Sequence, residues 1–311
     1  MTIEQARVVV HRKPWGVADL APWSGLNCGS DLIGELSYER ADPAAPISEL
    51  LLKLLFTSAP LSIQVHPDDA YATSISLPNG KSEAWYVLDA APGAKVALGL
   101  TKTLTRDQLR DAIEDRSIAE IVRWQAVDNN DAINVPAGTI HAIGAGLVIA
   151  EIQQRSDATF RLFDHGRDRG LHATHGAAAA HLGALEVQAP PKQLSEQRLL
   201  LASNRHFVFE RIALEPGSHW HLDATGETWL TAIKGDGKAG PFDLAHGSAV
   251  YAEGEPVDIR AGGIGVDCLV AYTGRDGPAR MLLQRVSQQS PASDRQFDKA
   301  RTQQRTIGTN P

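Results

Sequence analysis

Four polar side chains in the first half of the chain have the types and spacing of a metal site. Gln64 and His66 stand two residues apart in Gln-Val-His-Pro-Asp, so on a strand both project from the same face. Glu83 follows an Asn-Gly turn and leads into an apolar run, and His141 follows the turn Pro-Ala-Gly. Imidazole, carboxylate and amide groups together suit a divalent ion. Each residue alone is more typical of a hydrogen-bonded or solvated side chain, and only their joint occurrence indicates a site.

Short strands separated by turns are expected to position these residues. Apolar runs of strand length are closed by turn sequences such as Ala-Pro and Pro-Asp-Asp. The period changes to that of a helix over residues 103–125, where Thr105 and Gln108 match a capping box, and two short helices are predicted. One more helix is predicted over the Ala-rich residues 177–185. Strands are predicted at residues 50–56, 61–66, 84–88, 132–135, 147–153, 207–214, 227–233, 249–251 and 265–272. This pattern predicts an all-β protein, sandwich or barrel, with a helical insertion.

The composition restricts the class of protein. With 311 residues and 43% hydrophobic residues, the chain can bury a full core, which excludes wholesale disorder. A formal charge of -7 argues against a nucleic-acid binder, and an anionic ligand would need a local basic cluster. Cys28 and Cys268 lie far apart, which favours a reducing compartment over a disulfide scaffold. No leader or membrane span is recognisable, so we expect a cytoplasmic protein without a membrane partner.

Three stretches carry a resemblance to a known family. They read Leu-Ser-Ile-Gln-Val-His-Pro-Asp-Asp-Ala from residue 61, Gly-Lys-Ser-Glu-Ala-Trp-Tyr from residue 80, and Val-Pro-Ala-Gly-Thr-Ile-His from residue 135. A further stretch, Glu-Ile-Gln-Gln-Arg-Ser-Asp-Ala-Thr-Phe-Arg, begins at residue 151. In order and spacing these resemble the cupin superfamily and, more narrowly, the type I phosphomannose isomerases in their short bacterial form. The resemblance covers about residues 13–169 and is thin afterwards.

The resemblance implies a zinc-dependent isomerase that interconverts mannose 6-phosphate and fructose 6-phosphate through an enediol, with one Zn²⁺ per chain. By position, the implied zinc ligands are Gln64, His66, Glu83 and His141. The implied catalytic residues are Lys81, Arg161 and Glu151, and the implied phosphate contacts are Ser62 and Arg167. Lys81 near a cation would have its pKa lowered, and burial would raise that of Glu151, so either group could transfer the proton. Two departures bear on sugar preference: Arg155, and the lack of the family's tryptophan after Gly-Glu in the stretch 34–37.

The second half contains a partial repeat of the same motif. His219 and His221 flank a tryptophan, and Glu227 follows, but the later turn lacks the matching histidine. A structural role is therefore favoured over a second metal site. We predict two cupin domains of jelly-roll type: a catalytic domain at 1–187 containing the helical insertion, and a degenerate one at 193–286. A polar tail follows at 287–311.

Two alternatives to the isomerase remain open at this point. A cupin oxygenase would use iron on the same scaffold but would not need the basic residues. A non-catalytic cupin that binds a sugar phosphate would keep the pocket without turnover. The basic residues could also have ordinary roles. Lys81 could be a solvated lysine in a turn, and Arg161 and Arg167 could form surface ion pairs with Asp157, Asp164 or Asp168. Under both the isomerase and the sugar-phosphate-binding hypotheses, the partner is a small phosphosugar. The sequence does not predict the oligomeric state.

Overall fold

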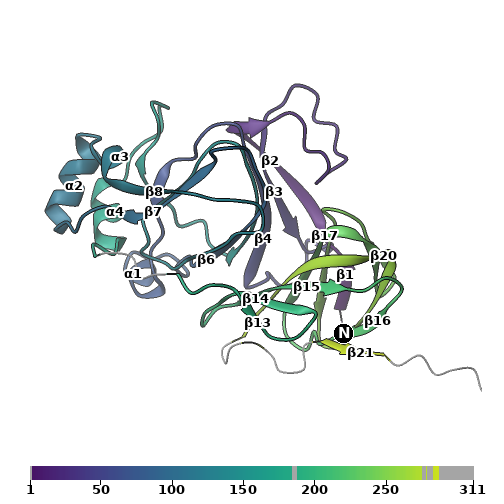
Figure 1. Ribbon diagram of the computed structural model, residues 1–311. Coiled ribbons are helices and arrows are strands. Elements are labelled where there is room, and N and C mark those ends of the chain that lie inside the picture. The colour runs from purple at the N-terminus through teal and green to yellow at the C-terminus, as the bar shows by residue number, and fades with distance from the viewer. Residues whose placement is uncertain (1, 184–187, 275–277, 279–282, 287–311) are drawn as a thin grey trace, which may run out of the picture.

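The computed structural model describes residues 2–183, 188–274, 278 and 283–286, and it is built mainly from antiparallel strands (Figure 1). Two sheets belong to the first half of the chain, and a third contains most strands of the second half. The predicted all-β class with a small helical part is therefore confirmed. The predicted tail at 287–311 lies outside the described residues.

Two sheets of the first half pack face to face. The six-stranded sheet has the order β2 (Arg7–Val17), β3 (Ile33–Glu39), β4 (Leu50–Thr57), β11 (Leu147–Gln154), β6 (Glu83–Ala90), β9 (Ala132–Val135). The five-stranded sheet has the order β12 (Phe160–Phe163), β5 (Ile63–Val65), β10 (His141–Ile143), β7 (Lys95–Leu100), β8 (Val122–Ala126). Trp85 of β6 and Val96 of β7 lie in the same buried apolar cluster. Because β6 lies in one layer and β5 and β10 in the other, the candidate ligands can converge between them.

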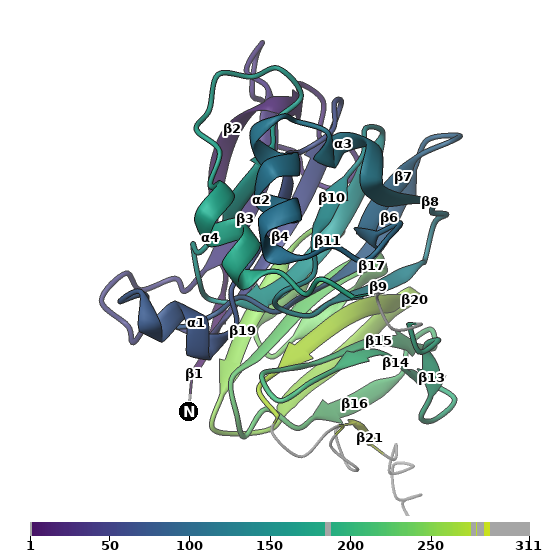
Figure 2. The same cartoon turned by 90° about the vertical axis from the view of Figure 1, so that its left-hand side faces the viewer.

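Each sheet has a different cover on its outer face. Helices α2 (Arg106–Glu114), α3 (Ile118–Ile121) and α4 (Ala173–Ala179) pack on the five-stranded sheet. They lie together at the left of Figure 1, on the side that faces the viewer in Figure 2. The outer face of the six-stranded sheet shares a core with the second half, in which Phe56 and Tyr86 cluster with Phe209 and Trp229. The two halves are thus joined through apolar burial.

One prediction for the helical region is confirmed by the structure, and another is wrong. The capping box is confirmed, because the Thr105 side chain accepts from the Gln108 amide and the Gln108 side chain caps Thr105 in return. The helix predicted at 177–185 is wrong in position. It begins at Ala173 and ends where Ala180 becomes extended and the His181 amide donates to the Gly138 carbonyl at 2.8 Å. Tertiary hydrogen bonding therefore overrides the helix propensity of the alanines; residues 184–187 are not described.

The third sheet contains the strands of the second half and also the first strand of the chain. Its main path runs β1 (Thr2–Gln5), β19 (Ala249–Glu253), β17 (Thr228–Ala239), β20 (Val257–Tyr272), β15 (Val208–Leu214), β14 (Arg198–Ser203), β13 (Lys192–Gln193). Beside that path lie β16 (His219–Leu222), β18 (Phe242–Leu244) and β21 (Leu283–Arg285). The predicted strands of this half are present, and β17 and β20 extend beyond their predicted bounds. No helix in the described part of the chain is long and apolar enough to cross a membrane.

Candidate metal centre and its pocket

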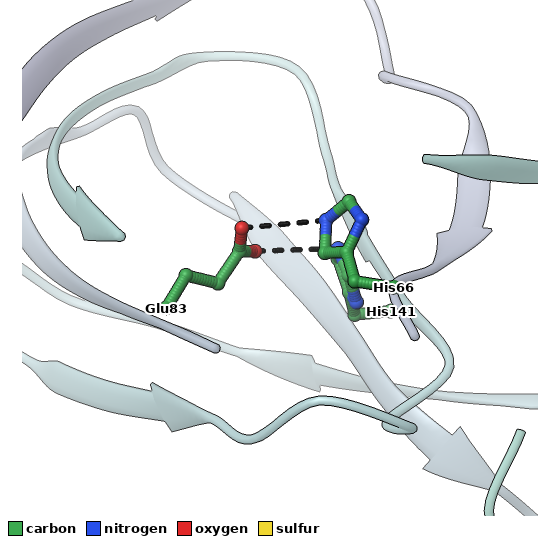
Figure 3. A group of neighbouring side chains, drawn as sticks. All are labelled: His66, Glu83 and His141. Carbon is green, nitrogen blue, oxygen red and sulfur yellow. Dashed lines mark ion pairs between the residues drawn. The ribbon is translucent and has the colours of Figure 1, made fainter. Parts of the chain in front are cut away.

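Three predicted ligands meet in the interior between the two sheets of the first half. Nε2 of His66 lies 3.3 Å from Oε2 of Glu83, and Nε2 of His141 lies 3.3 Å from Oε1 (Figure 3). All three side chains are 1% exposed. Within the described chain this is the only group of histidine, cysteine and acidic side chains close enough to share a metal ion.

Backbone carbonyls orient both imidazole rings toward the centre. Nδ1 of His66 lies 2.8 Å from the Ala158 carbonyl oxygen, and Nδ1 of His141 lies 2.9 Å from that of Thr139. When Nδ1 carries the proton and donates it to a carbonyl, Nε2 keeps its lone pair and faces Glu83. Metal-binding histidines in proteins typically have this arrangement.

The fourth predicted ligand, Gln64, lies beside His141. These residues are opposite each other on β5 and β10, and Nε2 of the Gln64 amide lies 3.2 Å from Nε2 of His141. Its Oε1 accepts a hydrogen bond from the Ser62 hydroxyl at 3.2 Å. Turning the Gln64 amide about its last torsion would exchange these two atoms and direct the oxygen toward the centre. The structure therefore brings all four predicted side chains together.

Protonation states at the centre are those that a metal ion requires. Burial, assisted by the positive charge of Lys81, lowers the pKa of His66 to about 3, and burial also lowers the pKa of His141. Burial opposes ionisation of Glu83, but the positive charge of Lys81 outweighs it and holds the pKa of Glu83 well below the usual range. Oε2 of Glu83 has the Lys81 ammonium 2.9 Å away, whereas Oε1 receives no hydrogen bond within the described residues. Two neutral imidazoles beside an ionised carboxylate with unused lone pairs fit a divalent cation.

Close backbone packing places Lys81 and Glu83 beside His66. A Cβ atom at Gly80 would lie 2.5 Å from the Pro67 carbonyl oxygen, so only glycine allows the two segments to approach this closely. The Lys81 amide donates to the same Pro67 oxygen at 3.0 Å. The loop that begins with His66 and the segment that leads into β6 are therefore locked against each other.

The centre opens into a cavity of about 1690 Å³ that Lys81, Glu83 and Glu151 help to line. Nζ of Lys81 lies 2.9 Å from Oε2 of Glu83, and burial of Lys81 is outweighed by the Glu83 and Glu151 carboxylates, which raise its pKa. The two carboxylates thus act against the lowering of the Lys81 pKa that a nearby cation would cause. Burial, and after it the charge of Glu83, raises the pKa of Glu151, as expected from the sequence.

Arg161 and Ser62 line the same cavity, whereas Arg167 does not. Arg161 lies opposite Gln64 on the neighbouring strand, and its Nη1 donates to the Gly170 carbonyl at 3.0 Å. Arg167 pairs with Asp164 at 2.9 Å and donates to the Pro60 carbonyl at 2.9 Å, which is the ion pairing considered as an alternative.

Sequence reasoning missed several charged residues of the pocket. Arg169 lines the cavity, pairs with Asp164 at 2.6 Å and lies 5.2 Å from the centre of the Trp15 ring. Lys53, Glu35 and Lys13 also line it. Lys53 stands inside an otherwise apolar run, Leu-Leu-Leu-Lys-Leu-Leu, and that one interruption was the available signal.

The partial motif of the second half does not assemble into a comparable site. His221 and His219 lie 2.6 Å and 3.6 Å from the Asp258 carboxylate on the neighbouring strand. Glu227 instead accepts the backbone amides of Glu49 and Leu50 in the first half. Arg155 pairs with Glu39 at 3.0 Å.

Comparison with known proteins finds relatives by sequence, although not through a family model. No family model matches the chain. It is 32% identical over 226 residues to a mannose-6-phosphate isomerase of Streptococcus mutans, a match that covers 61% of this chain and 71% of the relative. It is also 41% identical over 119 residues to the mannose-6-phosphate isomerase ManA of Bacillus subtilis, covering 38% of each chain.

Solved structures show the same fold. A mannose 6-phosphate isomerase from Bacillus subtilis aligns with 88% of this chain and 100% of its own, with a TM-score of 0.74 and 23% identity. A mannose 6-phosphate isomerase whose structure is described as holo and zinc bound aligns over the same shares, with a TM-score of 0.69 and 14% identity. The chain therefore has the fold of these mannose 6-phosphate isomerases.

Proposed function

This chain belongs to the mannose-6-phosphate isomerase family, and from that premise we propose that it interconverts D-mannose 6-phosphate and D-fructose 6-phosphate. The observation that carries the proposal is the buried group of His66, Glu83 and His141 at the base of a cavity lined by Lys81 and Glu151. The two cysteines are free, which suits a reducing compartment such as the cytoplasm.

We assign one Zn²⁺ per chain to Gln64, His66, Glu83 and His141. Two neutral imidazoles, one carboxylate and one amide oxygen form a donor set that zinc accepts. When bound there, the ion would act as a Lewis acid that polarises the carbonyl of the open-chain sugar and stabilises negative charge on its oxygen.

Proton transfer and substrate binding are carried out by side chains of the protein itself. Isomerisation moves a proton between C1 and C2 and another between their oxygens. We assign the carbon proton to Glu151, because burial gives this carboxylate a higher proton affinity than an exposed one and so makes it a stronger base. Lys81 would donate hydrogen bonds to the reacting oxygens. Ser62, Arg161 and Arg169 would bind the phosphate, whose binding energy positions the distant carbons.

A coupled assay with mannose 6-phosphate tests the proposal directly. Zinc-loaded protein should form fructose 6-phosphate, and elemental analysis should find zinc rather than iron. Iron at stoichiometric occupancy with oxygen consumption would favour an oxygenase instead. Binding of the sugar phosphate without turnover, at full zinc occupancy, would show a binding protein.

A further inference from the structure

One carboxylate joins the two segments that carry His66 and Glu83. Asp69 is the first residue of helix α1 (Asp69–Ser74) and stands three residues after His66. Its Oδ1 accepts a hydrogen bond from the Gly80 amide at 2.9 Å, and Gly80 stands three residues before Glu83. The Asp69 side chain therefore fixes the spacing between two segments that are separate in the sequence and meet at the metal centre.

Helix capping does not explain this carboxylate. The side chain of the preceding Asp68 already accepts from the Tyr71 amide and caps α1. An acidic residue in the first turn of a helix also interacts favourably with the helix dipole, but this effect does not require acceptor contacts outside the helix. Both oxygens of Asp69 make such contacts, so its role lies between segments of the chain.

Gln154, the last residue of β11, binds both the Asp69 carboxylate and the segment before Glu83. Its Nε2 donates to Oδ1 of Asp69 at 3.1 Å, and its Oε1 accepts from the Ser82 amide at 2.8 Å. The backbone N–H of Gln154 donates to the Ser82 carbonyl at 3.0 Å, and both residues are buried. Asp69 and Gln154 together thus hold the backbone on both sides of Lys81.

The second half of the chain reaches the other oxygen of the same carboxylate. Arg205 lies between β14 and β15, and its Nη2 donates to Oδ2 of Asp69 at 2.9 Å. Nε2 of the neighbouring His206 lies 3.8 Å from that oxygen. The Arg205 side chain is 68% exposed, so the ion pair itself contributes little to stability. Its consequence is geometric, because a carboxylate bound at Oδ2 keeps Oδ1 directed at Gly80.

We propose that Asp69 is a positioning residue for the metal centre, which sets the separation of His66 and Glu83, and that Arg205 makes the second half part of this device. The proposal rests on the zinc site of the proposed function but does not require turnover. Ligand distances at a zinc site vary by only about 0.2 Å, so a segment that is free to shift binds the ion less tightly. Loss of Asp69 would leave the Gly80 amide without its acceptor and release the segment that carries Glu83.

The experiment measures the zinc affinity of the full-length protein by competition with a chromogenic chelator. Asp69→Ala should weaken zinc binding about ten- to a hundredfold, because hydrogen bonds to an ionised group are lost. Asp69→Asn keeps an oxygen acceptor for Gly80 and should remain within about threefold of the wild type. Thr105→Ala is the control for stability, because it removes the cap of α2 on the outer side of the five-stranded sheet. Thermal unfolding should show a loss of stability for Thr105→Ala, while its zinc affinity stays that of the wild type.

Arg205→Met tests the link to the second half at an exposed position, where the fold is not at risk. Zinc affinity should fall about two- to fivefold in the otherwise wild-type protein and should not fall further when Asp69→Ala is already present. Unchanged affinity in Arg205→Met, or additive losses in the double variant, would overturn the role of Arg205.

The positioning role of Asp69 has its own contrary outcomes. Wild-type zinc affinity in Asp69→Ala, an equal loss in Thr105→Ala, or an Asp69→Asn variant as weak as Asp69→Ala would overturn it. Should Asp69→Ala not fold, Asp69→Asn and Arg205→Met still decide, because the proposal requires a loss in the second that exceeds any loss in Thr105→Ala. Failure of the zinc-loaded wild type to isomerise mannose 6-phosphate, with these zinc effects intact, would count against the proposed function alone.

Discussion

The Glu227 carboxylate accepts a hydrogen bond from the backbone N–H of Leu50 at 2.9 Å. A side chain of the second half thus provides the acceptor for the first backbone N–H of β4 in the first half. Its other oxygen accepts the Glu49 N–H at 2.6 Å, and Trp229 Nε1 donates to the carboxylate at 2.9 Å. A glutamate that resembles a metal ligand in the sequence thus joins the two halves of the molecule.

Glu227→Gln should change how stability depends on pH. Burial raises the pKa of Glu227 above its ordinary 4.5, although Trp229 and the two amides oppose it. The folded state therefore binds this proton more tightly than the unfolded state, and the resulting stabilisation is lost as pH rises through the folded pKa. From about pH 4.5 to 7, the free energy of unfolding should fall more steeply for the wild type than for the variant. Denaturant titrations at several pH values measure this, and parallel curves would contradict it.

Glu83→Ala should abolish both metal binding and turnover. The change removes the only carboxylate from the buried group, and we expect activity to fall at least about 100-fold. Metal content by elemental analysis and the coupled assay provide the two measurements, and chelation of the wild type should reproduce the loss. His221→Ala is the matched control, because that histidine belongs to the partial motif on the second half. Full zinc occupancy in Glu83→Ala would exclude Glu83 as a ligand.

Glu151→Gln should reduce kcat by about 10²–10⁴ while the protein keeps its fold and its zinc. The amide oxygen can still accept from Trp85 Nε1, which lies 3.2 Å from the carboxylate, so packing should be preserved. Steady-state kinetics and a thermal unfolding curve test both halves of this expectation. A variant with wild-type kcat would move the proton-transfer role away from Glu151.

Gly80→Ala should weaken zinc binding without touching any ligand. The added methyl group would overlap the Pro67 and Asp68 backbone, which forces the Lys81 to Glu83 segment away from His66. Overpacking of this kind costs about 1–3 kcal/mol in stability. Gly25→Ala is a matched control, because a Cβ there meets nothing within 4 Å. Competition with a chromogenic chelator compares the two variants, and equal zinc affinities would contradict the expectation.

Arg169→Met should raise KM for mannose 6-phosphate more than Arg167→Met does. Both arginines pair with Asp164, but only Arg169 lines the cavity, so only its loss removes a donor from the phosphate. A rise of about ten- to a hundredfold corresponds to one charge-assisted contact. A larger effect from Arg167→Met would restore the assignment that the sequence suggested.

The sequence predicted the metal centre better than the surrounding pocket. Gln64, His66, Glu83 and His141 stand in short local motifs whose turns and strand alternation can be recognised without knowing the fold. Lys53 and Glu35 come together with Glu151 only through the pairing of neighbouring strands, which local patterns do not specify. The same reason explains the misplaced helix at 177–185, because its end depends on a contact with the distant Gly138 turn.

The pairing of β1 with β19 affects the order in which the molecule can be completed. Thr2 to Gln5 precede all other strands of their sheet in the chain but pair with residues 250–253, so during synthesis this segment stays unpaired until β19 has left the ribosome. Without β1, β19 would lack a neighbour on one side, and an unpaired strand edge can recruit strands from other chains. Deletion of Thr2 to Gln5 should therefore appear first as aggregation during expression rather than as a defect in catalysis.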